Sequence, residues 1–215
     1  MFSEDKYEVI RGGISEELSF ISHMYLSVKS KAAKYVEERG ESLPSGEGFG
    51  CTQTRWSYTL YGDPLMEVLL LHCLSEIERV TATKLIPTYA YARQYVKSEQ
   101  LAKHKDRSSC ELSVTMNLGG SSWPIFLSTD GLDGEDIETG YIQGNSNGTP
   151  IVLNPGDMLI YKGCDLEHWR EPLEEGVCSQ VFLHFKEYLD KDSLKYKFDT
   201  RDLLGLPPRW RRDDL

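Results

Sequence analysis

Apolar residues recur at helical spacing in two segments of the N-terminal third of the chain. Residues 15–39 predict an amphipathic helix that Ser15 caps and Gly40 ends. Residues 63–81 predict a second helix, opened by an Asp-Pro pair, and we expect one of its faces to pack on something large. The apolar positions are Leu18, Ile21, Tyr25, Val28, Ala32 and Tyr35 in the first helix, and Val68, Leu71, Leu74, Ile77 and Val80 in the second.

From residue 84 onward the period of the pattern falls to two. Tyr89, Tyr91, Arg93 and Tyr95 alternate with smaller or polar residues, which is typical of a half-buried strand. The further short strands that we expect are Cys110 to Leu118, Trp123 to Ser128, Ile151 to Leu153, Met158 to Tyr161 and Cys178 to Phe185. Two helices followed by many short strands predict a mainly β fold with supporting α-helices, a sandwich or jelly roll.

The chain is long enough for one domain with a sizeable core, and its 215 residues predict a single domain. Within it we expect a helical N-terminal region (1–83), a β core (84–186) and a C-terminal tail (187–215). The tail mixes charged and apolar residues. It can wrap the domain or mediate self-association.

Composition narrows the classes of partner. The formal net charge is −10, and the dense basic cluster at residues 209–212 is followed at once by two aspartates, so nucleic acid is disfavoured as a partner. No apolar run approaches the length of about 20 residues that spans a bilayer. The first residues lack the order of a secretory signal, so we expect a cytoplasmic protein.

His104 and Asp106, which stand two positions apart in the sequence, can bind one metal ion. On extended backbone, residues i and i+2 point the same way, and both side chains can reach the same ion. His168 follows a tight turn, an apolar strand and a short loop, as expected where a jelly roll brings a distant strand back beside an earlier one. Two histidines and one carboxylate suit Fe(II) with open positions. The five cysteines contain no CxxC pair, which argues against a structural zinc site.

In this context the sequence resembles the core of the 2-oxoglutarate/Fe(II) oxygenases, nearest the prolyl-4-hydroxylase-like group. The resemblance covers about residues 63–186. It rests on the His-Lys-Asp motif at 104–106, the segment 159–168, the segment 176–185, and an aromatic residue, turn and strand at 95–101.

The resemblance implies a double-stranded β-helix (jelly roll, cupin-like) with iron at one end. It implies that His104, Asp106 and His168 are the metal ligands, with Fe(II), 2-oxoglutarate and O₂ as cofactor and cosubstrates. A substrate C–H would be hydroxylated, with succinate and CO₂ as coproducts. Related halogenases lack the metal-binding carboxylate, so the presence of Asp106 favours hydroxylation.

The sequence departs from the family where a cation usually anchors the distal carboxylate of 2-oxoglutarate. That Arg or Lys stands nine to twelve residues after the last metal histidine, whereas residues 177–180 here read Val-Cys-Ser-Gln. A dianion in a largely apolar barrel needs a charged or multiply hydrogen-bonded partner. Arg170 is the first candidate for this role and Arg93 the second. Neutral hydrogen bonds could come from Tyr95, Thr115 and Ser179.

We expect a small-molecule or peptidyl substrate, whose identity the sequence does not reveal. The resemblance allows a peptidyl proline, a free amino acid or another small metabolite. Trp169 and Arg107 flank the metal motifs and are candidates for substrate contact.

Three other functions remain open on the sequence. One is a non-catalytic jelly-roll module that binds a metal or ligand, which the missing cation favours. Another is a cupin-type metalloenzyme that does not use 2-oxoglutarate, although such sites are usually richer in histidine. The third is a nucleic-acid demethylase on the same fold, which the acidity disfavours.

Overall fold

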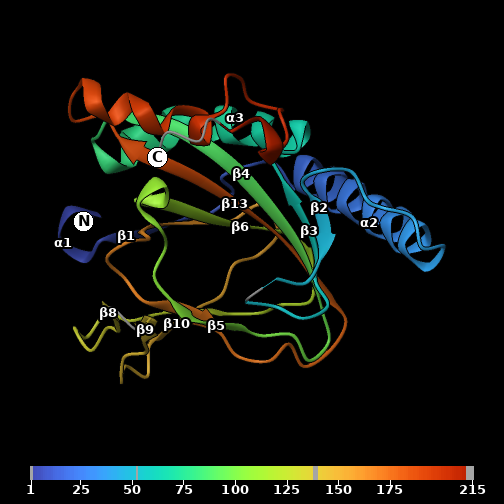
Figure 1. Ribbon diagram of the computed structural model, residues 1–215. Helices are drawn as coiled ribbons and strands as arrows, with labels where there is room; N and C mark the ends of the chain where they lie inside the picture. The colour runs from blue at the N-terminus through green and yellow to red at the C-terminus, as the bar shows by residue number, and fades with distance from the viewer. Residues whose placement is uncertain (1, 52, 138–139, 212–215) are drawn as a thin grey trace.

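Two antiparallel sheets face each other, and two long helices cover the outer face of the larger sheet (Figure 1). The structure is a computed structural model that describes residues 2–51, 53–137 and 140–211. The mainly β architecture with few helices is as predicted and matches a jelly-roll fold. None of the helices within these ranges is long and apolar enough to cross a membrane.

The elements follow one another along the chain with short connections. The helices are α1 (Phe2–Asp5), α2 (Glu16–Glu38), α3 (Pro64–Thr81) and the 3₁₀ segments η1 (Ser108–Cys110), η2 (Lys191–Thr200) and η3 (Pro208–Trp210). The strands are β1 (Tyr7–Ile10), β2 (Glu47–Phe49), β3 (Tyr58–Tyr61), β4 (Leu85–Val96), β5 (Leu101–His104), β6 (Leu112–Gly120), β7 (Ile125–Leu127), β8 (Glu135–Ile137), β9 (Gly140–Ile142), β10 (Thr149–Ile151), β11 (Met158–Lys162), β12 (His168–Arg170) and β13 (Val177–Glu187).

The strands lie in an order that brings distant segments together. Within the described ranges the larger sheet runs β1-β11-β6-β13-β4-β3-β2, and the smaller one β10-β7-β12-β5. Strands β8 and β9 pair only with each other in the acidic segment after residue 130. The predicted helical region 1–83 therefore also supplies three strands, β1, β2 and β3, to the larger sheet.

Alternation along the central strands separates a helix-facing side from an inner side. On β6, residues such as Val114 and Met116 join the core under the helices, together with Leu183 on β13 and Leu69 on α3. Burying one such side chain stabilises the fold by about 1.5–3 kcal/mol. The residues between them point toward the smaller sheet, so the inner side of β6, β13 and β4 is available for a site.

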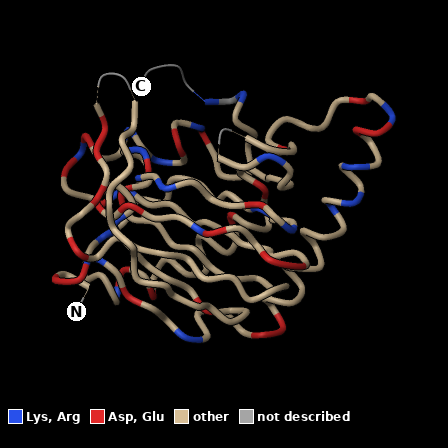
Figure 2. Tube along the Cα trace, turned by 90° about the horizontal axis from the view of Figure 1, so that it is seen from below, with Lys and Arg blue, Asp and Glu red and all other residues tan. Residues whose placement is uncertain are grey.

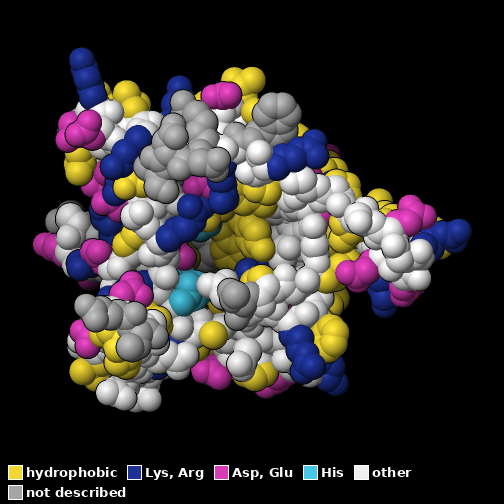
Figure 3. Space-filling model, viewed as in Figure 1, with side chains coloured by type: hydrophobic (Ala, Val, Ile, Leu, Met, Phe, Trp, Pro, Cys, Tyr) yellow, Lys and Arg dark blue, Asp and Glu magenta, His cyan; other side chains and the backbone are white. Residues whose placement is uncertain are grey.

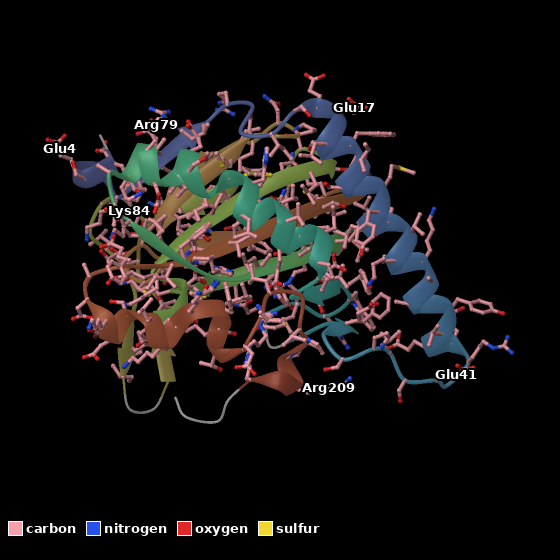
Figure 4. The ribbon with its side chains drawn as sticks, turned by 90° about the horizontal axis from the view of Figure 1, so that it is seen from above. Glu4, Glu17, Glu41, Arg79, Lys84 and Arg209 are labelled. Atoms are coloured by element: carbon pink, nitrogen blue, oxygen red, sulfur yellow. The ribbon has the colours of Figure 1, made fainter. Side chains whose placement is uncertain are left out.

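Both predicted long helices are present, but their buried faces differ from the expectation. Ser15 caps α2 by accepting a hydrogen bond from the Leu18 amide, and Asp63 caps α3 in the same way from Leu65. Two of the apolar residues expected to share a face, Ile21 and Val28, are more than half exposed. The residues that α2 buries are Ser19, Ser22, Leu26 and Ala33, and those that α3 buries are Met66, Glu67, Leu69, Leu70, Cys73 and Ile77. Small side chains allow α2 to lie close to the sheet, and Figure 4 shows both helices on its outer side.

The C-terminal tail packs on its own domain. Arg201 is buried and its guanidinium binds Glu67 of α3, 2.5 Å away, and the backbone carbonyl of Leu206. A buried guanidinium paired with a buried carboxylate holds two segments in one geometry, although its net contribution to stability is small. The tail thus wraps the domain, which was one of the two roles predicted for it.

Candidate metal centre and pocket

The two candidate histidines are cross-strand partners in the smaller sheet. Strand β12 pairs with β5 so that His168 lies directly opposite His104, and their ring centroids are 4.2 Å apart. Side chains at directly opposed positions of an antiparallel pair point to the same face. The register alone therefore brings together two residues that are far apart in the sequence.

Asp106 completes the group. Its Oδ1 lies 3.7 Å from Nε2 of His104 and 3.6 Å from Nε2 of His168. One ligand atom from each of the three residues lies within 4.8 Å of the other two. The backbone amide of Asp106 donates to the carbonyl of Gly163. This hydrogen bond holds the chain beyond β5 beside the loop that precedes β12. Such a spacing of two imidazoles and one carboxylate fits a single metal ion bound on one face.

The second carboxylate oxygen of Asp106 is held by a chain of hydrogen bonds through Ser113 and His184. The Ser113 hydroxyl donates to Oδ2 of Asp106 over 2.6 Å, and the Ser113 oxygen lies 3.0 Å from Nδ1 of His184. Because the one hydroxyl proton is directed at the carboxylate, Nδ1 of His184 is the donor to Ser113. A Cβ on Gly163 would lie 2.4 Å from Oδ2 of Asp106, so glycine at this position leaves room for the carboxylate.

The hydrogen bonds of both histidines fix which ring nitrogen faces Asp106. Nδ1 of His104 lies 2.8 Å from the carbonyl of Ala102, and Nδ1 of His168 lies 3.0 Å from that of Leu166. A carbonyl only accepts, so each Nδ1 carries the proton and each Nε2 presents a lone pair toward the centre. This backbone support is the arrangement usual for metal-binding histidines.

The electrostatics of the centre favour the ligand forms of these groups. Burial lowers the pKa of His104 to about 4, and the neighbouring His168 acts in the same direction. Burial alone would raise the pKa of Asp106, but His168, with His184 and His104, holds it below its usual range. Around neutral pH the site therefore presents a neutral His104 and an ionised carboxylate, as metal binding requires.

The three residues open into a pocket of about 540 Å³ between the sheets. In Figure 3 the hollow has an apolar floor, a histidine at its edge and Lys and Arg side chains above it. Its aromatic lining consists of Tyr61, Tyr89, Tyr91, Tyr161 and Phe182, and its basic lining of Arg93, Lys105, Arg107 and Arg211. A pocket of this size accommodates a small ligand with its cosubstrate.

Two arginines are buried between the sheets. Arg93 lines the pocket, and its guanidinium donates to Gln53 Oε1, 3.1 Å away, and to the Cys51 sulfur. Arg170 shares the inner face with His168 and donates to the Trp123 carbonyl and to Gln180. Among the described residues neither arginine has a carboxylate partner, and both Nε atoms are buried without a hydrogen bond.

The register explains how Arg93 comes to stand where a cation is missing from β13. Gln180 occupies the last position at which the sequence resemblance expected a cation, and it pairs directly with Arg93 of β4. Paired residues project to the same face, so the neighbouring strand places a positive charge beside that position.

Two of the predicted site residues point away from the pocket. Ser179 faces α2, where its hydroxyl lies 2.9 Å from Nδ1 of His23, because strand alternation turns the residue next to Gln180 outward. Trp169, next to His168, likewise faces outward and stacks on Phe126 with ring centroids 5.5 Å apart. The structure therefore places Ser179, predicted to bind the cosubstrate, and Trp169, predicted to contact the substrate, on the side away from the pocket.

The other predicted residues lie on the inner side. Thr115 and Tyr95 are fully buried beside the arginines, with Thr115 Oγ1 donating to Gln180 and Tyr95 accepting from Arg93. Neither forms part of the pocket lining. Arg107, the other predicted substrate contact, lines the pocket and donates to Asp199 of the tail.

The sequence pattern did not identify Ser113 as a site residue, and His184 was expected to be structural. Both could have been found from the two-residue alternation of side chains along a strand. Ser113 lies two residues before Thr115, and His184 lies four residues after Gln180, which places each on an inner face. Asp199 and Arg211 carried no recognisable signal, because their place depends on how the tail folds.

No protein-family model and no curated protein matches this sequence. Solved structures match at low identity. A prolyl-4-hydroxylase of Pseudomonas putida is 10% identical, with a TM-score of 0.52 over 86% of this chain and 95% of that one. The epimerase SnoN, in complex with Fe³⁺, α-ketoglutarate and nogalamycin RO, is 13% identical, with a TM-score of 0.62 over 86% and 80%. HygX of Streptomyces hygroscopicus, with nickel and 2-oxoglutarate bound, is 13% identical, with a TM-score of 0.57 over 87% and 85%.

These similarities extend across most of each chain and confirm, at the level of the fold, the resemblance seen in the sequence. The chain has the fold of the 2-oxoglutarate/Fe(II) oxygenases, prolyl-4-hydroxylases among them.

Proposed function

We propose that this protein is an Fe(II)- and 2-oxoglutarate-dependent oxygenase that hydroxylates a C–H bond of a small or peptidyl substrate. The observation that carries the proposal is the convergence of His104, Asp106 and His168 at a pocket that Arg93 also lines. Across residues 2–51, 53–137 and 140–211, no carboxylate pairs with the Arg93 guanidinium. We also propose that the two facing sheets form a double-stranded β-helix.

The three side chains fit an Fe(II) ion by donor type and by spacing. Backbone carbonyls hold both rings with Nε2 toward the centre, and Ser113 fixes the carboxylate, so the donors are oriented before a metal arrives. With three protein ligands, positions remain for 2-oxoglutarate and O₂. When bound, the iron and cosubstrate supply the oxidising chemistry that no amino-acid side chain can supply.

We propose that Arg93 binds the distal carboxylate of 2-oxoglutarate. A buried guanidinium without a carboxylate partner is costly, and an anionic ligand relieves that cost. Arg93 reaches the pocket, whereas Arg170, the first candidate on the sequence, is absent from its lining. We assign Arg170 to holding Gln180 and adding positive potential from the barrel interior.

The remaining lining residues position the substrate and exclude water. Tyr161 packs edge-on against the His168 ring, with centroids 4.8 Å apart, and Phe182 and Tyr91 line the same pocket. Apolar walls around a reactive centre protect it from side reactions with water.

The test is 2-oxoglutarate turnover, measured as succinate release that requires both Fe(II) and O₂. The wild-type protein should release succinate slowly without substrate and faster with one, and the product should gain the mass of one oxygen atom. Asp106→Ala should abolish release, while Asp165→Ala, at a surface ion pair with Lys6, should leave it unchanged.

Succinate release by Asp106→Ala at the wild-type rate would remove the assignment of the metal ligands. A metal-binding protein that never consumes 2-oxoglutarate would instead support the non-catalytic module.

A further inference from the structure

A ladder of two arginines and two tyrosines forms one wall of the pocket. The Tyr61 and Tyr89 rings stack with centroids 4.9 Å apart. The Arg107 guanidinium lies 4.9 Å from the Tyr89 centroid, and that of Arg211 lies 4.6 Å from the Tyr61 centroid. The four side chains come from β3, β4, the segment after β5 and the tail, and all line the pocket.

One carboxylate from the tail holds this ladder together. Oδ2 of Asp199 accepts from Arg107 over 2.8 Å, lies 2.7 Å from Nη2 of Arg211, and accepts from the Tyr61 hydroxyl over 2.5 Å. Asp199 is only 3% exposed. Asp199 engages one nitrogen of each guanidinium, and Nε of Arg211 donates to the Tyr61 hydroxyl over 3.2 Å, whereas each guanidinium carries five N–H donors. Donors therefore remain for a further acceptor.

The backbone at Asp199 is unusual. Phe198, Asp199 and Thr200 all have positive φ angles, of 56°, 53° and 66°. Positive φ is uncommon for residues other than glycine, and consecutive cases persist only where the surrounding structure enforces them. The buried pair of Arg201 with Glu67 fixes the chain immediately after this turn. The tail thus presents Asp199 to the pocket from a firmly held position.

The charge of this wall differs in sign from that of the chain. Lys105, Arg107 and Arg211 provide three positive charges at the pocket, and Asp199 offsets one of them. Within the described residues Lys105 has no carboxylate partner in an ion pair. Asp106, which also lines the pocket, faces the two histidines. The chain as a whole carries −10, and Figure 2 shows acidic residues recurring along its outer loops and turns.

We propose that Lys105, Arg107 and Arg211, named here the mouth cluster, bind an anionic group of the substrate, a carboxylate or a phosphate. The substrate's apolar or aromatic body would lie against Phe182 and Tyr91, with its reacting carbon toward the metal centre. Guanidinium groups stacked on aromatic rings keep their N–H edges free, and a planar fork of donors matches both kinds of oxyanion. This inference rests on the proposed function, because it names the substrate class of that site.

The test uses the full chain, loaded anaerobically with Fe(II) and 2-oxoglutarate, and calorimetric titration with simple probes. The probes are phenyl phosphate and phenylacetate, with neutral phenylacetamide matched in shape to the second. We expect at least one anion to bind about tenfold or more tightly than the amide, as charge-assisted hydrogen bonds predict. Arg107→Gln and Arg211→Gln should each weaken anion binding by about tenfold.

Two further variants keep the test decisive. Lys105→Gln breaks no ion pair among the described residues, so it should weaken the anions without disturbing the fold. Arg209→Gln removes the same charge from the same tail segment (labelled in Figure 4) but from a residue outside the pocket lining, so it should bind the anions like the wild type.

Equal binding of amide and anions, no anion binding at millimolar concentration, or unchanged binding in all three mouth-cluster variants would overturn the proposal. Failure of the proposed function would look different: the wild-type protein would release no succinate from 2-oxoglutarate, with or without a probe.

Discussion

The hydroxyl of Ser113 donates a 2.6 Å hydrogen bond to the oxygen of Asp106 that faces away from the two histidines. Asp106 is thereby held between a donor on β6 and the metal position, with His184 supporting the donor. Residues that orient a metal ligand in this way contribute strongly to affinity without touching the ion.

Replacing Ser113 by alanine should therefore weaken Fe(II) binding by about 10–100-fold, the range usual for such supporting hydrogen bonds. The dissociation constant can be measured anaerobically with Fe(II), or with Co(II) as a stable substitute. Ser109→Ala is the matched control, since Ser109 is also buried, its hydroxyl lies 3.8 Å from the Cys110 sulfur, and within the described part of the chain it bonds to no candidate metal ligand. Equal metal affinity in the two variants would show that Ser113 has no positioning role.

Gly163 should tolerate no side chain for a related reason. A methyl group there would lie 2.4 Å from Oδ2 of Asp106 and 2.7 Å from both the Ser113 hydroxyl and the Cys110 carbonyl, so Gly163→Ala should shift the Asp106 carboxylate from its position. We expect loss of metal binding in a protein that still folds, with a circular dichroism spectrum like that of the wild type. Gly48→Ala is the control, because the nearest atom there is 3.9 Å away. A Gly163→Ala protein with wild-type metal affinity would contradict the observed placement of Asp106.

Arg93 provides a test of cosubstrate binding that is separate from metal binding. Arg93→Gln should raise the KM for 2-oxoglutarate by about tenfold or more, because a charge-assisted hydrogen bond to a carboxylate is lost. Fe(II) affinity should change little. The control is Arg79→Gln, which removes an exposed guanidinium paired with Glu76 on α3. If Arg170→Gln raised this KM while Arg93→Gln did not, the anchor would be Arg170.

The buried His184 and the partly buried His104 make the stability of the metal-free protein depend on pH. Burial lowers the pKa of His184 from 6.5 to about 4 and that of His104 likewise. Between these values the unfolded chain takes up protons that the folded chain excludes, so the free energy of unfolding should fall as the pH drops from about 6.5 toward 4. Urea titrations at pH 7 and pH 5 measure this loss.

His184→Gln should reduce the difference between the two pH values, since the titrating group is gone while glutamine can still donate to Ser113. His72→Gln, at an exposed position on α3, should leave the difference unchanged. Identical pH dependence in wild type and His184→Gln would mean that His184 is not held neutral by the fold.

The three residues of the candidate metal centre could be located from the sequence because their signal is local. His104 and Asp106 stand two apart, and His168 follows a recognisable turn and strand, so the pattern survives without knowledge of the register. Ser179 and Trp169 show the limit. Each lies next to an inward-facing residue, and a change of one position along a strand reverses the side on which a residue lies.

The helices show a second limit. The pattern located α2 and α3 and their caps, but it did not identify the buried stripe of α2, where Ser19 and Ser22 lie under the helix and Ile21 is exposed. Ser19 donates to a carbonyl of β6, so its burial is compensated by a hydrogen bond that periodicity does not reveal. The strands in the first 83 residues are short, and β1 and β2 are edge strands of the sheet, which leaves little alternation to detect.

We propose that Fe(II) and 2-oxoglutarate bind together at His104, Asp106 and His168. The most direct measurement is the anaerobic visible absorption spectrum of the purified protein with Fe(II), before and after 2-oxoglutarate is added. We expect a charge-transfer band that requires both components and disappears in His168→Ala but persists in His72→Ala. A wild-type protein that binds stoichiometric Fe(II) and shows no band with 2-oxoglutarate would contradict it.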